Sequence, residues 1–176
     1  QDYKNILSPL DYRFLKEILY GGLRWYGKIF WILQNTSKRN IKDLPKATQS
    51  ALILGTYQIF YMDRVPDRSA VNESVEYVRA KGEKLAVPYV NGVLRSISRR
   101  CEYFAKPDKT KQPVKYLSLQ YSHPKWIVER WLDRFGFEKT KNLLLTNNKI
   151  PPCTIRINPL SPEFKGVVQF QHRILK

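Results

Sequence analysis

The sequence contains few of the residues on which catalytic and metal-binding sites usually depend. Among its 176 residues are two histidines, two cysteines and one methionine. His123 and His172 have no metal-ligand spacing, and Cys101 and Cys153 lie far apart. The cysteines fit two ordinary thiols in a reducing cytosol better than a disulfide framework. We therefore predict a cytoplasmic chain with no catalytic residue and no metal site.

Long apolar runs and phosphate-binding loops are also missing. No apolar run reaches the ~18 residues of a transmembrane span, and no charged-then-apolar start resembles a signal peptide. The pair Gly21-Gly22 lies inside a helical pattern and not after a strand, so it does not predict a dinucleotide loop. We expect no membrane partner and no cofactor site in this chain. Because the first residue is Gln1 and not Met, we expect the native start to lie upstream.

Basic residues are present in large excess. Lysine and arginine total 31 against 15 acidic residues, which gives a net charge of +16. Residues 1–105 hold 17 basic and 10 acidic side chains, and residues 106–176 hold 14 and 5. Such an excess favours a polyanionic partner, and nucleic-acid phosphates are the common one. The 43% of hydrophobic residues allow a packed core, and the length fits one domain or one domain plus part of another.

The first half has the pattern of a helical bundle. Ser8-Pro9-Leu10-Asp11 is typical of a helix start with Ser8 as the cap. The helix that follows has a predicted buried stripe at Leu15, Leu19, Gly22, Tyr26, Ile29 and Leu33. The pair Gly21-Gly22 is expected to bend this helix or to let a neighbour approach closely. Three further helices are predicted: one that opens at residues 43–45, one that ends near Gly82 after a loop over residues 63–68, and one over residues 87–100. The second helix is apolar almost all round over residues 51–62, which predicts the central helix of the bundle.

The second half begins with a candidate linker. Residues 106–115 contain two prolines and four lysines but only one strong apolar residue. Ser122 is then predicted to cap a helix that stops at Gly136, with a buried face formed by Ile127, Val128, Trp131, Leu132 and Phe135. A further helix is expected over residues 137–148, and short strands are expected over residues 153–157 and around 167–170. The predicted fold is mainly α, with a helical bundle over 1–105, a basic linker over 106–115 and the start of a small α+β domain over 116–176.

Basic side chains on the first helix lie opposite its apolar stripe. At roughly 100° per residue, the two sets are centred about 160° apart. The collective patch predicts phosphate contacts, although a solvated polar face is the commoner role for any single residue. Tyr12, Tyr20 and Trp25 could stack on unpaired bases, but packing within the protein is favoured for each. The residues predicted to bind RNA are Arg13, Lys16, Arg24, Lys28, Arg95, Arg99, Arg100, Lys109, Lys111, Lys115 and Arg130.

Other polar residues beside apolar faces are predicted to have structural roles. His123 lies between a serine and a proline, which favours a structural role over a catalytic one. Asn72, Glu73 and Asn91 are predicted to be buried hydrogen-bonding groups that fix the bundle.

Several motifs resemble known families. The first half resembles the NusB-type helical RNA-binding domain at Leu23-Arg24-Trp25, Leu54-Gly55-Thr56-Tyr57-Gln58, Arg64-Val65-Pro66, Ala70-Val71-Asn72-Glu73-Ser74-Val75 and Val90-Asn91-Gly92-Val93-Leu94-Arg95. The second half is similar to the segment that follows this domain in the Sun/Fmu (RsmB-type) ribosomal RNA cytosine-5 methyltransferases, at Tyr121-Ser122-His123-Pro124-Lys125-Trp126, Glu129-Arg130-Trp131 and Asn147-Asn148 to Asn158. The resemblance covers about residues 11–160.

This resemblance implies an activity for a longer parent protein. That activity is S-adenosylmethionine-dependent methylation of cytosine C5 in small-subunit ribosomal RNA, by a catalytic domain beyond Lys176. Cys153 aligns before a strand, where the family has an ordinary apolar residue, and is not the expected nucleophile. The helix that normally opens a NusB-type bundle is expected to be missing before Ser8, which would leave an apolar groove open.

We expect a monomeric RNA-binding segment that positions small-subunit ribosomal RNA and does not bind DNA. It would hold no cofactor itself, whereas the full-length parent would use S-adenosylmethionine. Two alternatives are a NusB-type transcription antitermination factor and a protein-interaction module. Residues 116–160 argue against the former, and the charge of +16 argues against the latter.

Overall fold

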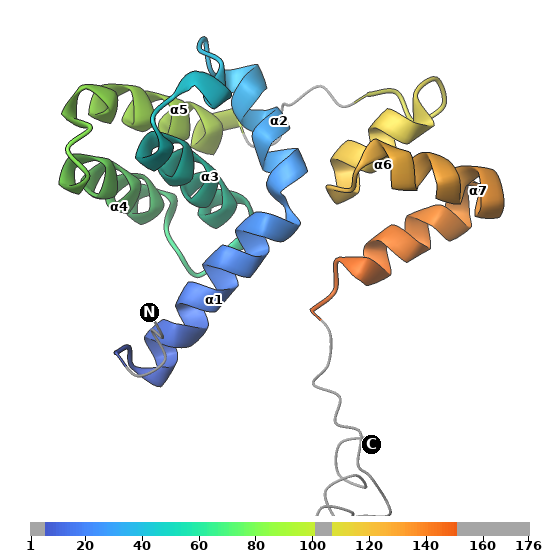
Figure 1. Ribbon diagram of the computed structural model, residues 1–176, viewed down its shortest axis with the longest axis horizontal. Helices are drawn as coiled ribbons and strands as arrows, with labels where there is room; N and C mark the ends of the chain where they lie inside the picture. The colour runs from blue at the N-terminus through green and yellow to red at the C-terminus, as the bar shows by residue number, and fades with distance from the viewer. Residues whose placement is uncertain (1–5, 101–106, 151–176) are drawn as a thin grey trace, which may run out of the picture.

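The computed structural model describes residues 6–100 and 107–150, apart from the side chain of Arg100. Every element within these ranges is a helix. The first range forms a bundle of five α-helices with two short 3-10 helices, and the second forms a helix pair beside it (Figure 1). The elements are α1 (Pro9–Arg24), α2 (Tyr26–Thr36), η2 (Ile41–Asp43), α3 (Lys46–Tyr61), α4 (Asp67–Ala80), η3 (Lys84–Ala86), α5 (Val87–Arg100), α6 (Pro113–Tyr121) and α7 (Lys125–Asn147).

Helix α3 is the centre of the bundle, as its all-round apolar sequence predicts. It packs against α1, α2, α4 and α5, so nearly every side of the helix meets another element. Leu52 is fully buried, and Gly55 lies so close to α5 that an added Cβ would meet Leu94 at 2.8 Å. The buried core around α3 consists of Ile29, Ile32, Leu33, Ile41, Ala51, Leu52, Tyr57, Val71, Val78, Val90, Val93, Leu94 and Ile97.

The predicted start of α1 is confirmed at the level of its hydrogen bonds. The Asp11 amide donates to Ser8 Oγ at 3.2 Å, and Ser8 Oγ donates to Asp11 Oδ2 at 2.6 Å. Pro9 occupies the first helical position, where its missing N–H costs nothing. The helix over residues 87–100 is also confirmed, whereas α4 begins at Asp67, inside the loop predicted over residues 63–68.

The first predicted helix is two helices, because the backbone leaves helical geometry at Trp25 (φ −96°, ψ 10°). The bend is therefore not at Gly21-Gly22. That pair instead allows close approach: a Cβ on Gly21 would lie 2.0 Å from ring atoms of Tyr57 on α3, and one on Gly22 would lie 3.2 Å from Leu54. Of the two expectations for the glycine pair, only the second is confirmed.

The predicted buried stripe is correct at Gly22, Ile29 and Leu33 and wrong at Leu19 of α1 and Tyr26 of α2. Gly22, Ile29 and Leu33 are buried, whereas Leu19 and Tyr26 are 45% and 46% exposed. The glycine face of α1 packs on α3, and three leucines outside that face are exposed: Leu10, Leu19 and Leu23. Apolar side chains of α1 are therefore exposed, while the open groove expected from the sequence stays a prediction.

Helices α6 and α7 bury a small core of their own. Leu117 and Tyr121 of α6 pack with Val128 and Leu144 of α7. Pro113 is the first residue of α6, so residues 113–115 form a helical turn and not the end of the predicted linker. Helix α6 is not among the predicted elements.

Gly136 interrupts α7 with φ 72° and ψ 176°. The predicted stop at Gly136 and the predicted helix beyond it are both confirmed, since a left-handed φ favours glycine. Ile127, Trp131 and Leu132 pack against the core of the pair as predicted, whereas Phe135 is 38% exposed. The strands expected over residues 153–157 and 167–170 lie outside the described residues.

Ser122 caps a helix, but not the helix that the sequence predicts. Pro124 precedes α7, and Ser122 ends α6 in the left-handed conformation (φ 56°). Its Oγ accepts hydrogen bonds from the Gly27 amide at 2.9 Å and the Lys28 amide at 3.3 Å. Ser122 therefore caps the first turn of α2, 95 residues earlier in the chain.

Neighbours of Ser122 hold this turn in place. His123 Nδ1 and Asn148 Nδ2 lie 2.7 Å and 2.9 Å from the Tyr121 carbonyl oxygen, and Ser118 Oγ donates to the His123 carbonyl at 2.5 Å. The predicted structural role of His123 agrees with these contacts. Together they join the turn between α6 and α7 to the end of α7, while Ser122 joins the same turn to α2.

Replacement of Gly21 with alanine tests the α1–α3 contact. We expect Gly21→Ala to lower the free energy of unfolding by about 1–3 kcal/mol, because the new methyl group overlaps the Tyr57 ring. The matched control is Gly92→Ala on α5, where an added Cβ meets no atom within 4 Å. The control should gain up to about 1 kcal/mol from helix propensity. Urea unfolding measures both, and a stabilised Gly21→Ala variant would contradict the contact.

Candidate nucleic-acid interface

The predicted basic stripe on the first helix is divided by the break at Trp25. Arg13 and Lys16 are exposed on α1, and Arg24 is half-buried at its end. The Lys16 Nζ lies 5.2 Å from the centre of the Tyr12 ring, which is a cation–π contact. Lys28 belongs to α2, so the prediction that Arg13, Lys16, Arg24 and Lys28 share one helix is wrong.

The same face of α1 also has a contact with the core. The Tyr57 hydroxyl of α3 donates to Glu17 Oε1 at 2.8 Å. Burial, together with this hydrogen bond and the charge of Glu17, raises the pKa of Tyr57 to about 12, and the positive charge of Arg24 opposes the shift. Glu17 and Arg24 therefore mark the edge where the basic face of α1 meets α3.

Lys28 lies over an aromatic cluster at the junction of α1 and α2. Its Nζ is 5.5 Å from the ring centre of Trp25 and 5.8 Å from that of Tyr61. The Trp25 and Tyr61 rings are stacked, with centroids 4.6 Å apart. Burial raises the pKa of Tyr61, and the adjacent Tyr57 contributes to the shift. Trp25 is therefore packed within the protein as favoured from the sequence, whereas Tyr20 stays 61% exposed on α1.

The four predicted basic residues of the second unit, residues 107–150, are all exposed. Lys109 and Lys111 lie in a turn before α6, Lys115 lies on α6 and Arg130 lies on α7. The turn is organised by Asp108, whose Oδ1 accepts hydrogen bonds from the Thr110 hydroxyl and from the Thr110 and Lys111 amides. These bonds lower the pKa of the Asp108 carboxyl.

Lys109 differs from the other three because it lies beside a groove between the turn and α7. Its Nζ is 5.3 Å from the centre of the Phe137 ring. Glu129 and Asp133 line the same groove, so their negative charges oppose the positive potential of the lysine there. The groove is thus a poor phosphate site.

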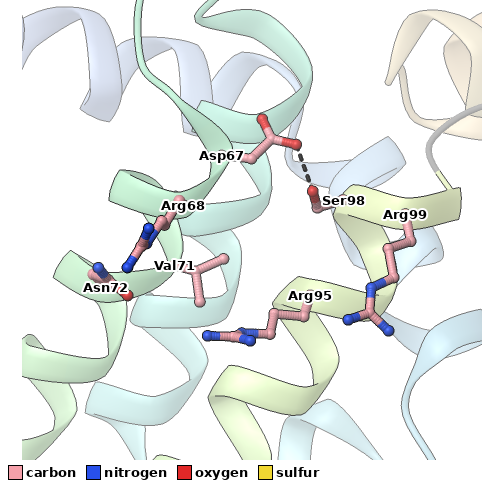
Figure 2. Close-up of a pocket in the computed structure, with 7 residues that line it drawn as sticks. All are labelled: Asp67, Arg68, Val71, Asn72, Arg95, Ser98 and Arg99. Carbon is pink, nitrogen blue, oxygen red and sulfur yellow. Dashed lines mark hydrogen bonds between the residues drawn. The ribbon is translucent and has the colours of Figure 1, made fainter.

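Arg95 and Arg99 are brought together with an arginine that the sequence analysis does not select. Both lie on α5 and line a hollow of about 520 Å³, which Arg68 lines from α4 (Figure 2). The i, i+4 pair Arg68 and Asn72 on one face of α4 is the sequence signal that could have indicated it. Arg100, the third predicted residue on α5, has a side chain outside the described part of the structure.

Two of the predicted buried groups on these helices are exposed. Asn72 and Glu73 on α4 face solvent, and Asn91 on α5 is half-buried. Asn91 Oδ1 accepts a hydrogen bond from Arg95 Nε at 2.9 Å. Asn91 therefore orients an arginine of the hollow and does not fix the core.

The eleven predicted residues lie in three regions of the chain: helices α1 and α2, the end of α5, and the second unit. Ion pairs join Arg79 to Glu76 and Lys141 to Glu138, and neither pair includes a predicted residue. Within the described residues, no helix combines the length and apolar character needed to cross a membrane. No group of three or more His, Cys, Asp and Glu side chains in the same ranges could hold a metal ion.

Comparison with known proteins accounts for both halves of the chain. Residues 1–99 match the model of the NusB family. The chain belongs to the NusB family. Residues 123–169 of this NusB-family chain match a second model, described as the Methyltr_RsmF/B-like, ferredoxin-like domain. The resemblance and the helical-bundle fold predicted from the motifs are thereby confirmed.

Relatives of this NusB-family chain are named as ribosomal RNA methyltransferases. A probable ribosomal RNA small subunit methyltransferase B of Bacillus subtilis is 34% identical over 159 residues, which are 90% of this chain and 35% of the relative. The probable enzyme of the same name from Synechocystis is 34% identical over 94% of the chain and 37% of the relative. The ribosomal RNA small subunit methyltransferase B of Shigella flexneri is 29% identical, with 90% and 37% covered. The chain thus spans about a third of the length of these relatives.

Removal of charge from α1 tests whether this face contacts phosphates. We expect Arg13→Gln with Lys16→Gln to reduce the slope of log affinity against log salt by roughly 0.7 per lost contact with single-stranded RNA. The control replaces Lys46 and Lys84, which are exposed and outside the predicted set, with glutamine. Filter binding over a series of salt concentrations measures both. An equal change in the two double variants would show that only the net charge matters.

Proposed function

We propose that this chain is the RNA-binding part of a small-subunit ribosomal RNA methyltransferase. It would position the RNA for a methyl-transfer domain in the two thirds of the relatives' length that the chain does not span. The observation that carries this proposal is the joining of two units in one chain. Helix α2 of a NusB-family bundle is capped by Ser122, which directly precedes the RsmF/B-like match.

The order of the two units favours an enzyme over a free-standing binding factor. A transcription antitermination factor of the NusB type has no need for residues 123–169, yet they match a methyltransferase-associated domain. Ser122, which directly precedes these residues, also accepts two hydrogen bonds from the bundle. A protein-interaction module remains the third candidate, and the net charge of +16 argues for RNA instead.

Positioning is the role that we assign to this chain. Phosphate contacts fix the register of an RNA without reading its sequence, and a bound RNA presents its reacting base at a high effective concentration. The proposed phosphate contacts are the eleven predicted residues, with Arg13, Lys16 and the arginines of α5 foremost. Lys109 contributes least, because acidic groups share its groove.

The methylated atom, the methyl donor, the location and the oligomeric state are proposed for the parent enzyme. It methylates C5 of a cytosine, takes the methyl group from S-adenosylmethionine, and works in the cytoplasm as a monomer. The described residues do not fit this cofactor: they form helices only, whereas a Rossmann-like domain binds its cofactor at a loop that follows a strand. We therefore assign no chemical step to this chain.

Competition between RNAs tests the proposal. The chain should bind a small-subunit ribosomal RNA transcript more tightly than a large-subunit transcript or a messenger RNA of the same length. Four to six single-stranded phosphate contacts would give a salt slope of roughly −3 to −4. Equal affinity for all three RNAs would reduce the chain to a general polyanion binder. A preference for a short transcription leader RNA would favour the antitermination factor.

A further inference from the structure

A hollow between α4 and α5 collects three arginines from two helices. Arg68 lies in the first turn of α4, and Arg95 and Arg99 lie one turn apart near the end of α5. Figure 2 shows Arg95 extending from α5 toward α4, with Arg68 and Asn72 on the facing helix. The volume of about 520 Å³ is within the range of small-molecule pockets, roughly 300–1,000 Å³.

The charge of the hollow is positive at every physiological pH. Asp67 is the acidic residue among its lining residues, and its Oδ2 already accepts a hydrogen bond from Ser98 Oγ at 2.5 Å across the two helices. Three arginines against one aspartate leave two positive charges. Because arginine does not lose its proton in proteins, the three arginines keep their charge at physiological pH.

A hydrogen bond fixes the orientation of the Arg95 guanidinium group. Its Nε is occupied by Asn91 Oδ1 at 2.9 Å, which orients the guanidinium plane and leaves the two terminal nitrogens as donors. Guanidinium groups bind phosphate oxygens through paired N–H bonds, and such bonds are stronger than those between neutral groups. The Arg95 guanidinium, which extends toward α4 in Figure 2, can therefore hold one phosphate group, and Arg99 adds positive charge from the same helix.

The remaining lining residues can contact a nucleotide base. Val71, which is only 3% exposed, forms the apolar floor of the hollow, and the exposed Asn72 amide can both donate and accept hydrogen bonds. Unpaired RNA bases stack on guanidinium planes and are recognised through hydrogen bonds to their edges. Arg68 and Asn72 lie one turn apart on α4, so both reach the same side of the hollow.

We propose that this hollow binds one unpaired nucleotide of RNA, with its phosphate on Arg95, its base beside Arg68, Val71 and Asn72, and with Arg99 adding positive charge. The inference rests on the proposed function, since it names the part of the chain that grips single-stranded ribosomal RNA. A base within a duplex stays stacked on its neighbours, so the hollow selects unpaired RNA. This site supplies local specificity that phosphate contacts on α1 alone do not.

The test uses the intact chain and the four nucleoside 5′-monophosphates as probes. Titration followed by nuclear magnetic resonance of the arginine Nε–H groups should shift the signals of Arg68, Arg95 and Arg99. Each nucleotide should bind more tightly than inorganic phosphate or the matching nucleoside alone. Arg95→Gln should weaken nucleotide binding roughly tenfold, the effect of one lost charged hydrogen bond. Asn72→Ala should reduce the differences between bases while keeping phosphate binding.

The control variant is Arg79→Gln, which removes an exposed arginine from α4 that pairs with Glu76 outside the hollow. It should leave nucleotide binding unchanged, and thermal unfolding checks that every variant keeps the fold. Phosphate that binds as tightly as the nucleotides would overturn the proposal in favour of a general anion site. An acidic peptide that competes better than any nucleotide would overturn it in favour of a protein partner.

A parallel measurement with small-subunit ribosomal RNA separates this proposal from the proposed function. If the RNA binds but Arg95→Gln changes neither RNA nor nucleotide binding, the hollow is not the nucleotide site and the proposed function stands. If nucleotides bind in the hollow but the RNA does not bind the chain, the proposed function fails and the hollow is a mononucleotide site. Loss of both affinities in Arg95→Gln, with Arg79→Gln unchanged, is the result that we expect.

Discussion

Two hydrogen bonds to the hydroxyl of Ser122, together with the packing of α2 on α6, join the two units of this chain. The first amides of a helix have no acceptor within the helix, and Trp25, which precedes α2, provides no side-chain cap. The acceptor for Gly27 and Lys28 comes from the end of α6. Helix α2 is therefore capped only when α6 is docked, and this couples the order of the second unit to that of the bundle.

The docked arrangement places basic groups on several helices that cannot shift independently. Helix α2 packs against α1, α3 and α5 on one side and against α6 on another. The orientation of α1 depends on the bend at Trp25 and on the close approach of Tyr57 to Gly21. A ribosomal RNA held by such a surface would meet charges at fixed separations, which is the requirement for setting its register.

Local sequence signals predict those parts of the structure that depend on neighbouring residues. The Ser8 cap, the helix over residues 87–100 and the stop at Gly136 need only nearby partners, and all three are confirmed. The role of Ser122 depends on amides 94 and 95 residues away, which no helix-start rule can detect. Close approach at Gly21-Gly22 is among the expectations from the sequence, but apolar periodicity does not show that this contact leaves Leu19 exposed. Arg68 was missed since the hollow exists only after α4 packs on α5.

A distance measurement between the two units tests the central claim that Ser122 and its neighbours hold them as one body. Spin labels would replace Glu73 on α4 and Lys139 on α7, both exposed, in a chain whose Cys101 and Cys153 are changed to serine. Double electron–electron resonance should give one narrow distance distribution, and Ser122→Gly, which keeps the left-handed turn but removes the hydroxyl, should broaden it. A broad distribution in the chain that retains Ser122 would contradict the account.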